Sequence, residues 1–362
     1  MTRYLLAGGG TAGHVNPLLA LADTIRDAEP AAQIWALGTA EGLESRLVPA
    51  RGYKLLTVDR LPFPRKLNAS ALKFPARYRA MVKKVEGYLK QQKIDVVVGF
   101  GGYASAPAYA AAKNLKIPYV VHEANALAGM ANKWAARNAS AIGVAFHNSR
   151  MKNAWFVGMP LRAEIASMAA GLTQADRVAA RAHFGLDEST PTLLVTGGSL
   201  GAKRINESIE ASRNFLSAAG IQVLHIVGDR SEYEAEQTAD FVRLKYCDRM
   251  DLAIAAADFA VARAGAATVS EFAAVGLPAV YVPYPVGNGE QKFNVADIVE
   301  AEGGALCLDA DFTPDYVRNT LIPLVSDSRS RNHMATRAKV VGVSDGSKRL
   351  LELVHSVLPA SA

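Results

Sequence analysis

Three glycine-rich segments are the places where this chain can approach an anionic group most closely. Gly8, Gly10 and Gly13 form a GxGxxG pattern, and related segments lie at 99–102 and 197–201. Each follows an apolar run and precedes a helical pattern, so the backbone can approach a phosphate while the helix directs free N–H groups at its charge. The glycines can also serve only as tight turns, but three such loops favour phosphate binding.

A histidine at the end of the first loop is the candidate general base. Imidazole titrates near neutral pH, so His14 can accept a proton from an attacking hydroxyl. The alternative is that His14 only caps or orients the loop, and the sequence does not decide between the two roles. His122 and Glu123 lie at the carboxyl end of a predicted strand, where we expect His122 to support the loop.

A second set of candidate binding residues lies near residue 263. The segment RAGAATVSE, Arg263 to Glu271, follows an apolar run and opens a helical pattern, so Thr268 and the helix start can bind phosphate oxygens. Glu271 can accept hydrogen bonds from a ribose diol, or it can simply be stabilised by the helix dipole. Gln291 and Asn294 are three residues apart, can share a helix face, and can bind sugar hydroxyls.

These residues are placed by strands that alternate with helices, a pattern typical of parallel sheets with crossover helices. Strand patterns fall at 3–7, 33–37, 94–98, 118–122, 140–144, 192–196, 222–227, 258–262, 279–282 and 305–308. Helical patterns fall at 14–28, 103–115, 127–137, 203–219, 266–275 and 291–302, with a last amphipathic helix at 344–358.

A repeated strand–turn–helix unit divides the chain into two domains. The strand before GGTAG at 9–13 and the strand before GGSLG at 197–201 each open a doubly wound domain. The boundary is expected near 157–162, where glycine and proline interrupt the pattern. A dinucleotide dehydrogenase is disfavoured, because the strand at 33–37 ends in Gly38-Thr39 with no acid at its tip to bind a ribose.

Positive charge is concentrated in one segment. Among the 362 residues the formal net charge is +6, but residues 60–93 contain ten Lys or Arg and one acid, Glu86. The segment therefore carries +9 and the rest of the chain −3, which indicates one local anionic partner rather than nucleic acid. Phe63, Leu67 and Leu72 are candidate apolar anchors for a membrane surface. No apolar run reaches 18 residues, so we expect no transmembrane helix.

The cysteines and the possible metal ligands do not indicate a disulfide or a metal site. Cys247 and Cys307 are sixty positions apart and form no ligand-spaced cluster, so a reduced, cytoplasmic setting is the simplest interpretation. No DxD or histidine cluster suits a metal, and we expect neither a metal nor a cofactor.

Taken together, the ordered motifs resemble the MurG family of bacterial N-acetylglucosaminyltransferases. The matching segments are 9–14 (GGTAGH) with Asn16-Pro17, 99–103 (GFGGY), 122–125 (HEAN), 158–162 (GMPLR), 197–202 (GGSLGA), 263–266 (RAGA) and 289–291 (GEQ) with Asn294. The resemblance implies transfer of GlcNAc from UDP-GlcNAc to the undecaprenyl-linked acceptor lipid I, with inversion and without an obligatory metal. The product, lipid II, serves peptidoglycan synthesis.

The family also implies an α/β fold of the GT-B type, in which two doubly wound Rossmann-like domains face a cleft. We expect an N-terminal domain at 1–158 on the acceptor and membrane side, and a donor domain at 159–342. The last helix, within 343–362, is expected to pack back on the first domain. The protein is expected at the cytoplasmic face of the cell membrane, held peripherally by the basic segment 60–93, with no nucleic-acid partner.

Site residues carry over from the family motifs position by position. The resemblance implies that Thr11, Ala12 and Gly13 line the donor sugar and the acceptor side. The other substrate-binding residues are Asn125, Arg162, Ser199, Cys247, Ala267, Thr268, Glu271, Gln291 and Asn294. We assign the acceptor diphosphate to Gly101, Gly102 and Tyr103, and His14 remains the candidate base.

The sequence departs from the family pattern at two positions, and three alternative functions remain open. The family often has Gln at Ala124, so a contact can be missing there, and Cys247 stands at the uracil-facing position, which is often aliphatic. A sugar-nucleotide 2-epimerase would share the fold class without needing a basic membrane patch. A non-catalytic binding protein would bind donor without releasing UDP, and a nucleic-acid binder is the weakest alternative.

Overall fold

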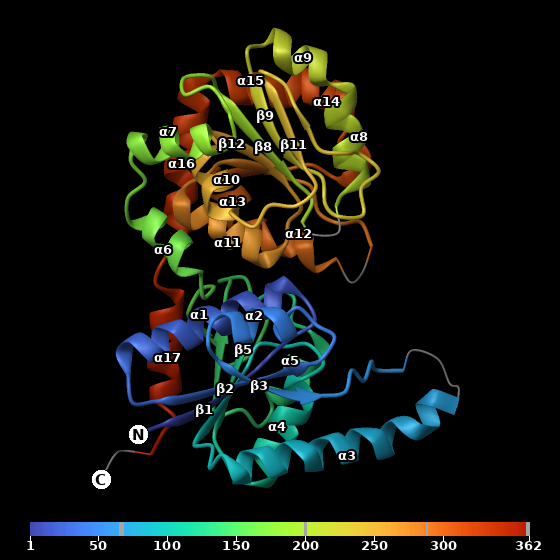
Figure 1. The fold of residues 1–362 in the computed structure, drawn as a ribbon, viewed down its shortest axis with the longest axis vertical. Coiled ribbons are helices and arrows are strands. Elements are labelled where there is room, and N and C mark those ends of the chain that lie inside the picture. The colour runs from blue at the N-terminus through green and yellow to red at the C-terminus, as the bar shows by residue number, and fades with distance from the viewer. Residues whose placement is uncertain (65–68, 199–200, 287–288, 360–362) are drawn as a thin grey trace. The chain divides into compact units, whose positions relative to one another are not determined.

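A computed structural model describes residues 1–64, 69–198, 201–286 and 289–359, with only the backbone at 69–71 (Figure 1). The chain divides into two compact units. The first is Met1–Arg162 together with Asp345–Ala362, and the second is Ala163–Ser344. The sequence placed the boundary slightly earlier, after residue 158.

A parallel sheet forms the centre of the first unit, with seven strands in the described part of the chain, ordered β3-β2-β1-β4-β5-β6-β7. The strands are β1 (Arg3–Ala7), β2 (Gln33–Thr39), β3 (Lys54–Val58), β4 (Val96–Gly99), β5 (Tyr119–Glu123), β6 (Ala141–Val144) and β7 (Trp155–Phe156). Ala7, the last residue of β1, pairs with Leu37 of β2 and with Gly99, the last residue of β4. The strand order reverses between β1 and β4, which is where such sheets bind ligands.

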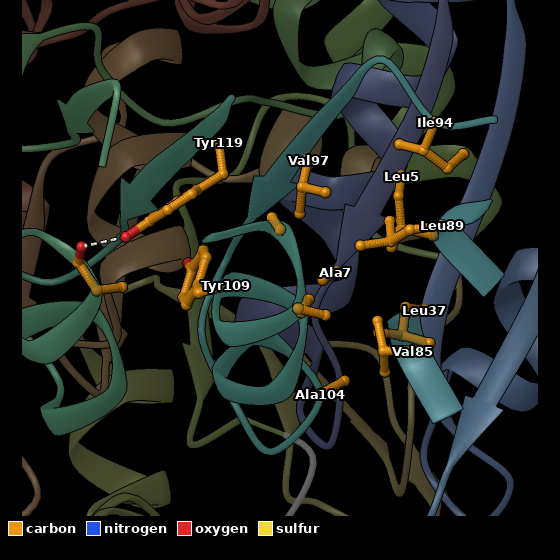
Figure 2. Packing of buried hydrophobic residues seen from close by; sticks show 14 of the residues in the cluster. Leu5, Ala7, Leu37, Val85, Leu89, Ile94, Val97, Ala104, Tyr109 and Tyr119 are labelled. Atoms are coloured by element: carbon orange, nitrogen blue, oxygen red, sulfur yellow. Dashed lines mark hydrogen bonds between the residues drawn. The ribbon is translucent and has the colours of Figure 1, made fainter. Parts of the chain in front are cut away.

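Helices and alternating side chains build a core on each face of this sheet. The helices are α1 (Ala12–Ala28), α2 (Glu44–Ala50), α3 (Ala69–Gln91), α4 (Ser105–Asn114), α5 (Met130–Ala135) and α17 (Gly346–His355). Because successive strand residues point to opposite faces, Leu5 faces α3 and α4 while Leu6 faces α1 and α17. Figure 2 shows Val85 and Leu89 of α3 against Leu37 and Leu5 of the sheet.

The second unit repeats the architecture with one change at its edge. Its strands, in the order β10-β11-β9-β8-β12-β13-β14, are β8 (Thr192–Thr196), β9 (Gln222–Ile226), β10 (Glu236–Gln237), β11 (Phe241–Leu244), β12 (Phe259–Ala262), β13 (Ala279–Tyr281) and β14 (Gly304–Leu306). Every pairing is parallel except that of β10 with β11. The order reverses between β8 and β12, so both units confirm the predicted doubly wound class.

The helices of the second unit precede, connect and follow these strands. They are α6 (Ala163–Ala170), α7 (Gln174–His183), α8 (Lys203–Ala211), α9 (Arg213–Ala218), α10 (Met250–Ala256), α11 (Ala266–Val275), α12 (Glu290–Asn294), α13 (Ala296–Glu300), α14 (Pro314–Tyr316), α15 (Ile322–Ser326) and α16 (Ser328–Val341), with a 3-10 turn η1 (Asp309–Asp311) and a π turn η2 (Val317–Leu321). In the described part of the chain, no helix is both long and apolar enough to cross a membrane.

Two predicted helices are interrupted in the structure. The pattern at 203–219 forms α8 and α9, which meet at Ser212, whose hydroxyl donates to the Ser208 carbonyl and competes with regular helix bonding. The pattern at 291–302 forms α12 and α13, which meet at Val295. Neither interruption moves a strand, so the placement of the glycine loops is unaffected.

Candidate functional site

The first glycine loop connects β1 to α1 at the reversal point of the first sheet, and His14 lies in the first turn of α1. Gly10 has φ +88°, a conformation that favours glycine. His14 Nδ1 lies 3.2 Å from the Gly9 carbonyl oxygen. The Thr11 hydroxyl lies at the same distance from Nδ1. Because a carbonyl can only accept, a hydrogen bond to Gly9 requires the proton on Nδ1, which leaves a lone pair on Nε2. The loop therefore holds His14 in the tautomer that a base acting through Nε2 requires.

Burial keeps the His14 imidazole neutral. Desolvation lowers the pKa of His14 below its ordinary value of 6.5, although the Gly9 hydrogen bond and the negative charges of Glu123 and Glu44 oppose the shift. A neutral imidazole near physiological pH can accept a proton. The side chain is only partly buried, so a reacting group can reach it.

The second glycine loop packs directly on the first. Gly101 and Gly102 have φ +94° and +80°. A Cβ on Gly102 would lie 2.6 Å from the Gly9 carbonyl oxygen, and a Cβ on Gly101 would lie 3.2 Å from His14 Nε2. Glycine at both positions therefore lets the two loops meet, with the free nitrogen of His14 facing the second loop.

Buried polar residues hold this second loop in place. Ser105 Oγ lies 2.7 Å from both the Ala7 and Gly101 carbonyl oxygens and 3.0 Å from the Gly101 nitrogen, so it links the ends of β1 and β4. Tyr103 is about one-third exposed, and the Arg60 guanidinium lies 5.4 Å from its ring centroid. The acceptor-side residues predicted at 101–103 thus adjoin the start of the basic segment.

A third loop, after β5, is organised by the buried Glu123 carboxylate. It accepts hydrogen bonds from the Asn125 and Gly129 backbone N–H groups and from Asn132 Nδ2 at 2.9, 3.0 and 3.0 Å. The Asn125 side-chain amide lies 3.4 Å from the same carboxylate. Glu123 therefore positions Asn125. His122 donates from Nε2 to the Gly158 carbonyl at 3.1 Å and is fully buried, which agrees with a supporting role.

In the second unit, the loop after β8 closes against a neighbouring strand end. Gly201 has φ +79°, and a Cβ there would lie 2.5 Å from the Val227 carbonyl oxygen. This tight approach precedes the start of α8. Ser199, predicted near the donor diphosphate, lies outside the described residues.

The loop after β12 leads into the N-terminus of α11. Gly265 is the N-cap of this helix and has no side chain with which to satisfy the first N–H groups. Ala267, Thr268 and Glu271 are partly exposed along its first turns. Arg263 instead pairs with Asp309 at 2.5 Å and donates to the Val282 carbonyl. The helix start, rather than Arg263, is available to an anion.

The two amides predicted to bind sugar hydroxyls occupy different environments. Gln291 is partly buried, and its Oε1 accepts the Tyr284 backbone N–H at 2.9 Å. Asn294 is only 1% exposed, and its Nδ2 donates to the Ala264 carbonyl at 3.1 Å. Asn294 thus ties α12 to the loop before α11, and Gln291 is the more accessible of the two.

The other predicted substrate-binding residues are distributed over both units. Cys247 is buried between β11 and α10 in the second unit. Arg162 is partly buried at the end of the first continuous segment. Thr11, Ala12 and Gly13 form the exposed or half-exposed start of α1. Within the ranges that the structure describes, no group of three or more His, Cys, Asp or Glu residues could hold a metal ion.

Sequence reasoning missed one charged residue of this site. Glu44 is fully buried on the first turn of α2, and its carboxylate accepts the Gly10 backbone N–H at 2.9 Å. An acid therefore does reach the tip of β2, where none was predicted. A ribose cannot reach this acid, because Glu44 is buried and bonded to Thr39 and Gly10. In the sequence, Glu44 lies five residues after Thr39, the last residue of β2, and a turn separates the two.

Both halves of the chain match models of one enzyme class. Residues 4–144 match the glycosyltransferase family 28 N-terminal domain, and residues 192–350 match the glycosyltransferase family 28 C-terminal domain.

Relatives that match over the full chain are described as UDP-N-acetylglucosamine–N-acetylmuramyl-(pentapeptide) pyrophosphoryl-undecaprenol N-acetylglucosamine transferases. The one from Leifsonia xyli subsp. xyli is 56% identical over 100% of both chains. The one from Streptomyces coelicolor is 46% identical over 99% of both.

Solved structures agree with the fold. The crystal structure of Acinetobacter baumannii MurG superposes with a TM-score of 0.77 at 25% identity, covering 98% of this chain and 100% of that one. A Listeria monocytogenes protein described as a UDP-N-acetylglucosamine 2-epimerase superposes with a TM-score of 0.68 at 12% identity, over 98% of this chain and 96% of that one. The latter likeness is one of fold alone.

Proposed function

The chain belongs to the family of UDP-N-acetylglucosamine–N-acetylmuramyl-(pentapeptide) pyrophosphoryl-undecaprenol N-acetylglucosamine transferases, and on that premise we propose that it transfers GlcNAc from UDP-GlcNAc to lipid I. The product is lipid II, the precursor for peptidoglycan. What supports this activity most directly is the location of the glycine loops: they follow β1 and β4 in one unit and lead from β8 in the other, at the reversal points where such sheets bind ligands.

The donor is held mainly by the second unit. Its diphosphate lies at the start of α11, where Ala267 and Thr268 offer unpaired helix N–H groups and a hydroxyl. Glu271, one turn further along, accepts the ribose hydroxyls. Gln291 binds the GlcNAc hydroxyls through its amide, and Asn294 holds the adjacent backbone in position.

The remaining donor contacts follow from the family motifs. Cys247 lies beside uracil, and its backbone can make that contact whatever the side chain. Ser199 and Arg162 contact the donor, with Ser199 near the diphosphate. From the first unit, Asn125 reaches GlcNAc from a loop that Glu123 holds rigid.

The acceptor is activated in the first unit. His14 Nε2 takes the proton of the acceptor hydroxyl, whose oxygen attacks the anomeric carbon as the bond to UDP breaks. Thr11, Ala12 and Gly13 line the site at the start of α1. Gly101, Gly102 and Tyr103 hold the acceptor diphosphate through the second loop. The departing UDP is stabilised at the α11 N-terminus.

The basic segment 60–93 docks the first unit on an anionic membrane surface. The described basic side chains of α3 are exposed, at Lys73, Arg77, Arg79, Lys83, Lys84 and Lys90. Phe63 and Leu72 are 48% and 85% exposed, while Leu67 lies outside the described residues. The Phe63 ring lies 6.2 Å from that of Trp134, itself 61% exposed, which enlarges the apolar patch. This combination of charge and exposed aromatic surface is typical of peripheral membrane binding, here at the cytoplasmic face.

Release of UDP from UDP-GlcNAc, measured with and without a lipid I analogue, tests the activity. We expect release only when the acceptor is present, with GlcNAc appearing on the acceptor. Donor binding without release would favour a binding protein, and acceptor-independent conversion of the sugar would favour an epimerase. Either result would contradict the proposed transfer.

A further inference from the structure

The buried Glu44 carboxylate lies against the first glycine loop. One oxygen accepts the Gly10 backbone N–H at 2.9 Å, and the other accepts the Thr39 backbone N–H and hydroxyl at 2.7 and 2.8 Å. Three donors therefore converge on one carboxylate that is fully buried. Such charge-assisted bonds are stronger than neutral ones, so they fix the loop to the end of β2.

Three glycines leave the space that this carboxylate fills. A Cβ on Gly9, Gly38 or Gly42 would lie 2.3, 2.3 or 2.2 Å from the nearest Glu44 side-chain atom. These glycines come from the first loop, from β2 and from the turn before α2. A side chain at any of them would displace Glu44, so the site is built from three separate parts of the unit.

The carboxylate lies one residue from the group that holds His14. Gly10 donates to Glu44, while its neighbour Gly9 accepts the His14 Nδ1 proton. Burial raises the pKa of Glu44, but the hydrogen bonds from Gly10 and Thr39 outweigh it, and the net pKa lies below the ordinary value. Glu44 is therefore negatively charged at neutral pH. Its carboxylate already accepts the Gly10 N–H, which would otherwise be available to a phosphate bound at this loop.

We propose that Glu44 is a positioning residue for the transfer reaction: it fixes the first glycine loop so that His14 Nε2 faces the second loop. Because a second anion at Gly10 would be repelled, the acceptor diphosphate binds at Gly101 and Gly102 instead. The first glycine loop thus holds a base and not a phosphate. This assignment rests on the proposed function, in which His14 is the base.

Replacing the carboxylate by an isosteric amide tests the assignment. In Glu44→Gln, the amide NH₂ must face either the Gly10 N–H or the Thr39 N–H. At least one bond between the loop and the end of β2 is therefore lost, and the remaining one no longer has a charged acceptor. We expect kcat to fall roughly 10- to 100-fold, while the KM for UDP-GlcNAc stays within about twofold. Glu41→Gln, which changes an exposed acid in the same turn, is the matched control and should keep wild-type kcat.

The pH profile separates a positioning charge from a purely structural one. Glu44 and Glu123 are the acids whose charges raise the pKa of His14. Loss of one negative charge lowers that pKa, so the acidic limb of the kcat profile should move to lower pH in Glu44→Gln. An unchanged limb, or a kcat equal to that of Glu41→Gln, would overturn the proposal.

A double-mutant cycle with Gly42 tests the same contact, because Gly42→Ala displaces the carboxylate and Glu44→Ala removes it. The φ of Gly42 is not left-handed, so Gly42→Ala leaves the backbone unstrained and acts only by displacing Glu44. We expect Gly42→Ala to lower kcat as Glu44→Gln does, and to cost nothing further when added to Glu44→Ala, which empties the space. Additive losses would count against the proposal.

Two controls keep this proposal distinct from the proposed function. Far-UV circular dichroism and calorimetric binding of UDP-GlcNAc establish that each variant is folded and binds donor. Failure of the wild-type protein to release UDP in the presence of acceptor would refute the transfer itself. Wild-type transfer together with a fully active Glu44→Gln variant would refute only the role of Glu44.

Discussion

In the proposed mechanism, the chemistry of the first unit depends on His14. Its Nδ1 proton is held by the Gly9 carbonyl at 3.2 Å, and its Nε2 points at the place where Gly101 lacks a side chain. A neutral imidazole in a single tautomer needs no reorganisation before it accepts a proton. The supporting residues Ser105 and Glu123 contact the loops rather than His14 itself, so their role is to hold the geometry.

His14→Ala should lower kcat about 10²- to 10⁴-fold, the contribution typical of a general base. Calorimetric binding of UDP-GlcNAc should persist, because the proposed donor contacts lie mainly in the second unit. The exposed His183 provides the control His183→Ala, which should remain active. Near-normal turnover of His14→Ala with intact donor binding would mean that another group is the base.

The pH dependence of kcat follows from the burial of His14. The base must be neutral to act, and its pKa lies below the ordinary 6.5. The midpoint of the acidic limb of the kcat profile should therefore lie below pH 6.5. A steady-state pH profile at saturating substrates measures this, and an acidic limb above pH 6.5 would contradict it.

A substitution of Glu271 tests the proposed donor-binding residues. Glu271→Gln should raise the KM for UDP-GlcNAc about tenfold with little change in kcat, because a charged hydrogen bond to a ribose hydroxyl is made equally in the ground and transition states. Glu188→Gln, at an exposed position of the same unit, is the matched control. A fall in kcat at unchanged KM would instead place Glu271 in the chemical step.

Among the elements, α3 carries the clearest surface prediction. The triple variant Lys73→Gln, Arg77→Gln and Arg79→Gln removes three exposed charges from one helix. Each is worth about 1 kcal/mol at an anionic leaflet, so partitioning onto anionic vesicles should fall roughly 100-fold. The control Arg329→Gln, Arg337→Gln and Lys348→Gln removes the same charge from exposed sites on α16 and α17. Equal sedimentation of the wild type with neutral and anionic vesicles would contradict membrane docking through charge.

Helix α17 is part of the first hydrophobic core although it is the last helix of the chain. Leu350 and Val354 are fully buried in the same cluster as Leu18 of α1. Leu350→Ala should cost about 2–5 kcal/mol of stability through lost burial and a cavity. The exposed Val340→Ala on α16 is the control. Urea unfolding followed by tryptophan fluorescence measures the effect. If Leu350→Ala unfolded at the same urea midpoint as Val340→Ala, the proposed contribution of α17 to the core would be wrong.

The strands next to the glycine loops were predictable because they are buried on both faces and therefore apolar throughout. Val96–Gly99 and Thr192–Thr196 are examples. β3 was missed because Lys54–Val58 is a sheet-edge strand with mostly half-buried residues, which weakens its pattern. Glu44 was missed because its partners are backbone groups on β2 and the first loop, and only the fold brings these together.

At the scale of the whole molecule, the family resemblance drawn from the motifs is confirmed by relatives matching over the full chain. Each unit has its own sheet and its own core clusters. In the proposed mechanism, the base lies in the first unit and the nucleotide binds the second. The three tryptophans, Trp35, Trp134 and Trp155, all lie in the first unit.

That distribution of tryptophan allows the two units to be followed separately. UDP binds only the folded second unit in this scheme, so at 100 times its Kd it should stabilise that unit by about 2.7 kcal/mol. The urea midpoint seen by far-UV circular dichroism should therefore rise, while the tryptophan-monitored midpoint of the first unit stays in place. In Glu271→Gln, the same UDP concentration should give a smaller rise, because the Kd is larger. If UDP moved both midpoints equally, the nucleotide could not be held by the second unit alone, and the separation of base from donor between two independent cores would have to be abandoned.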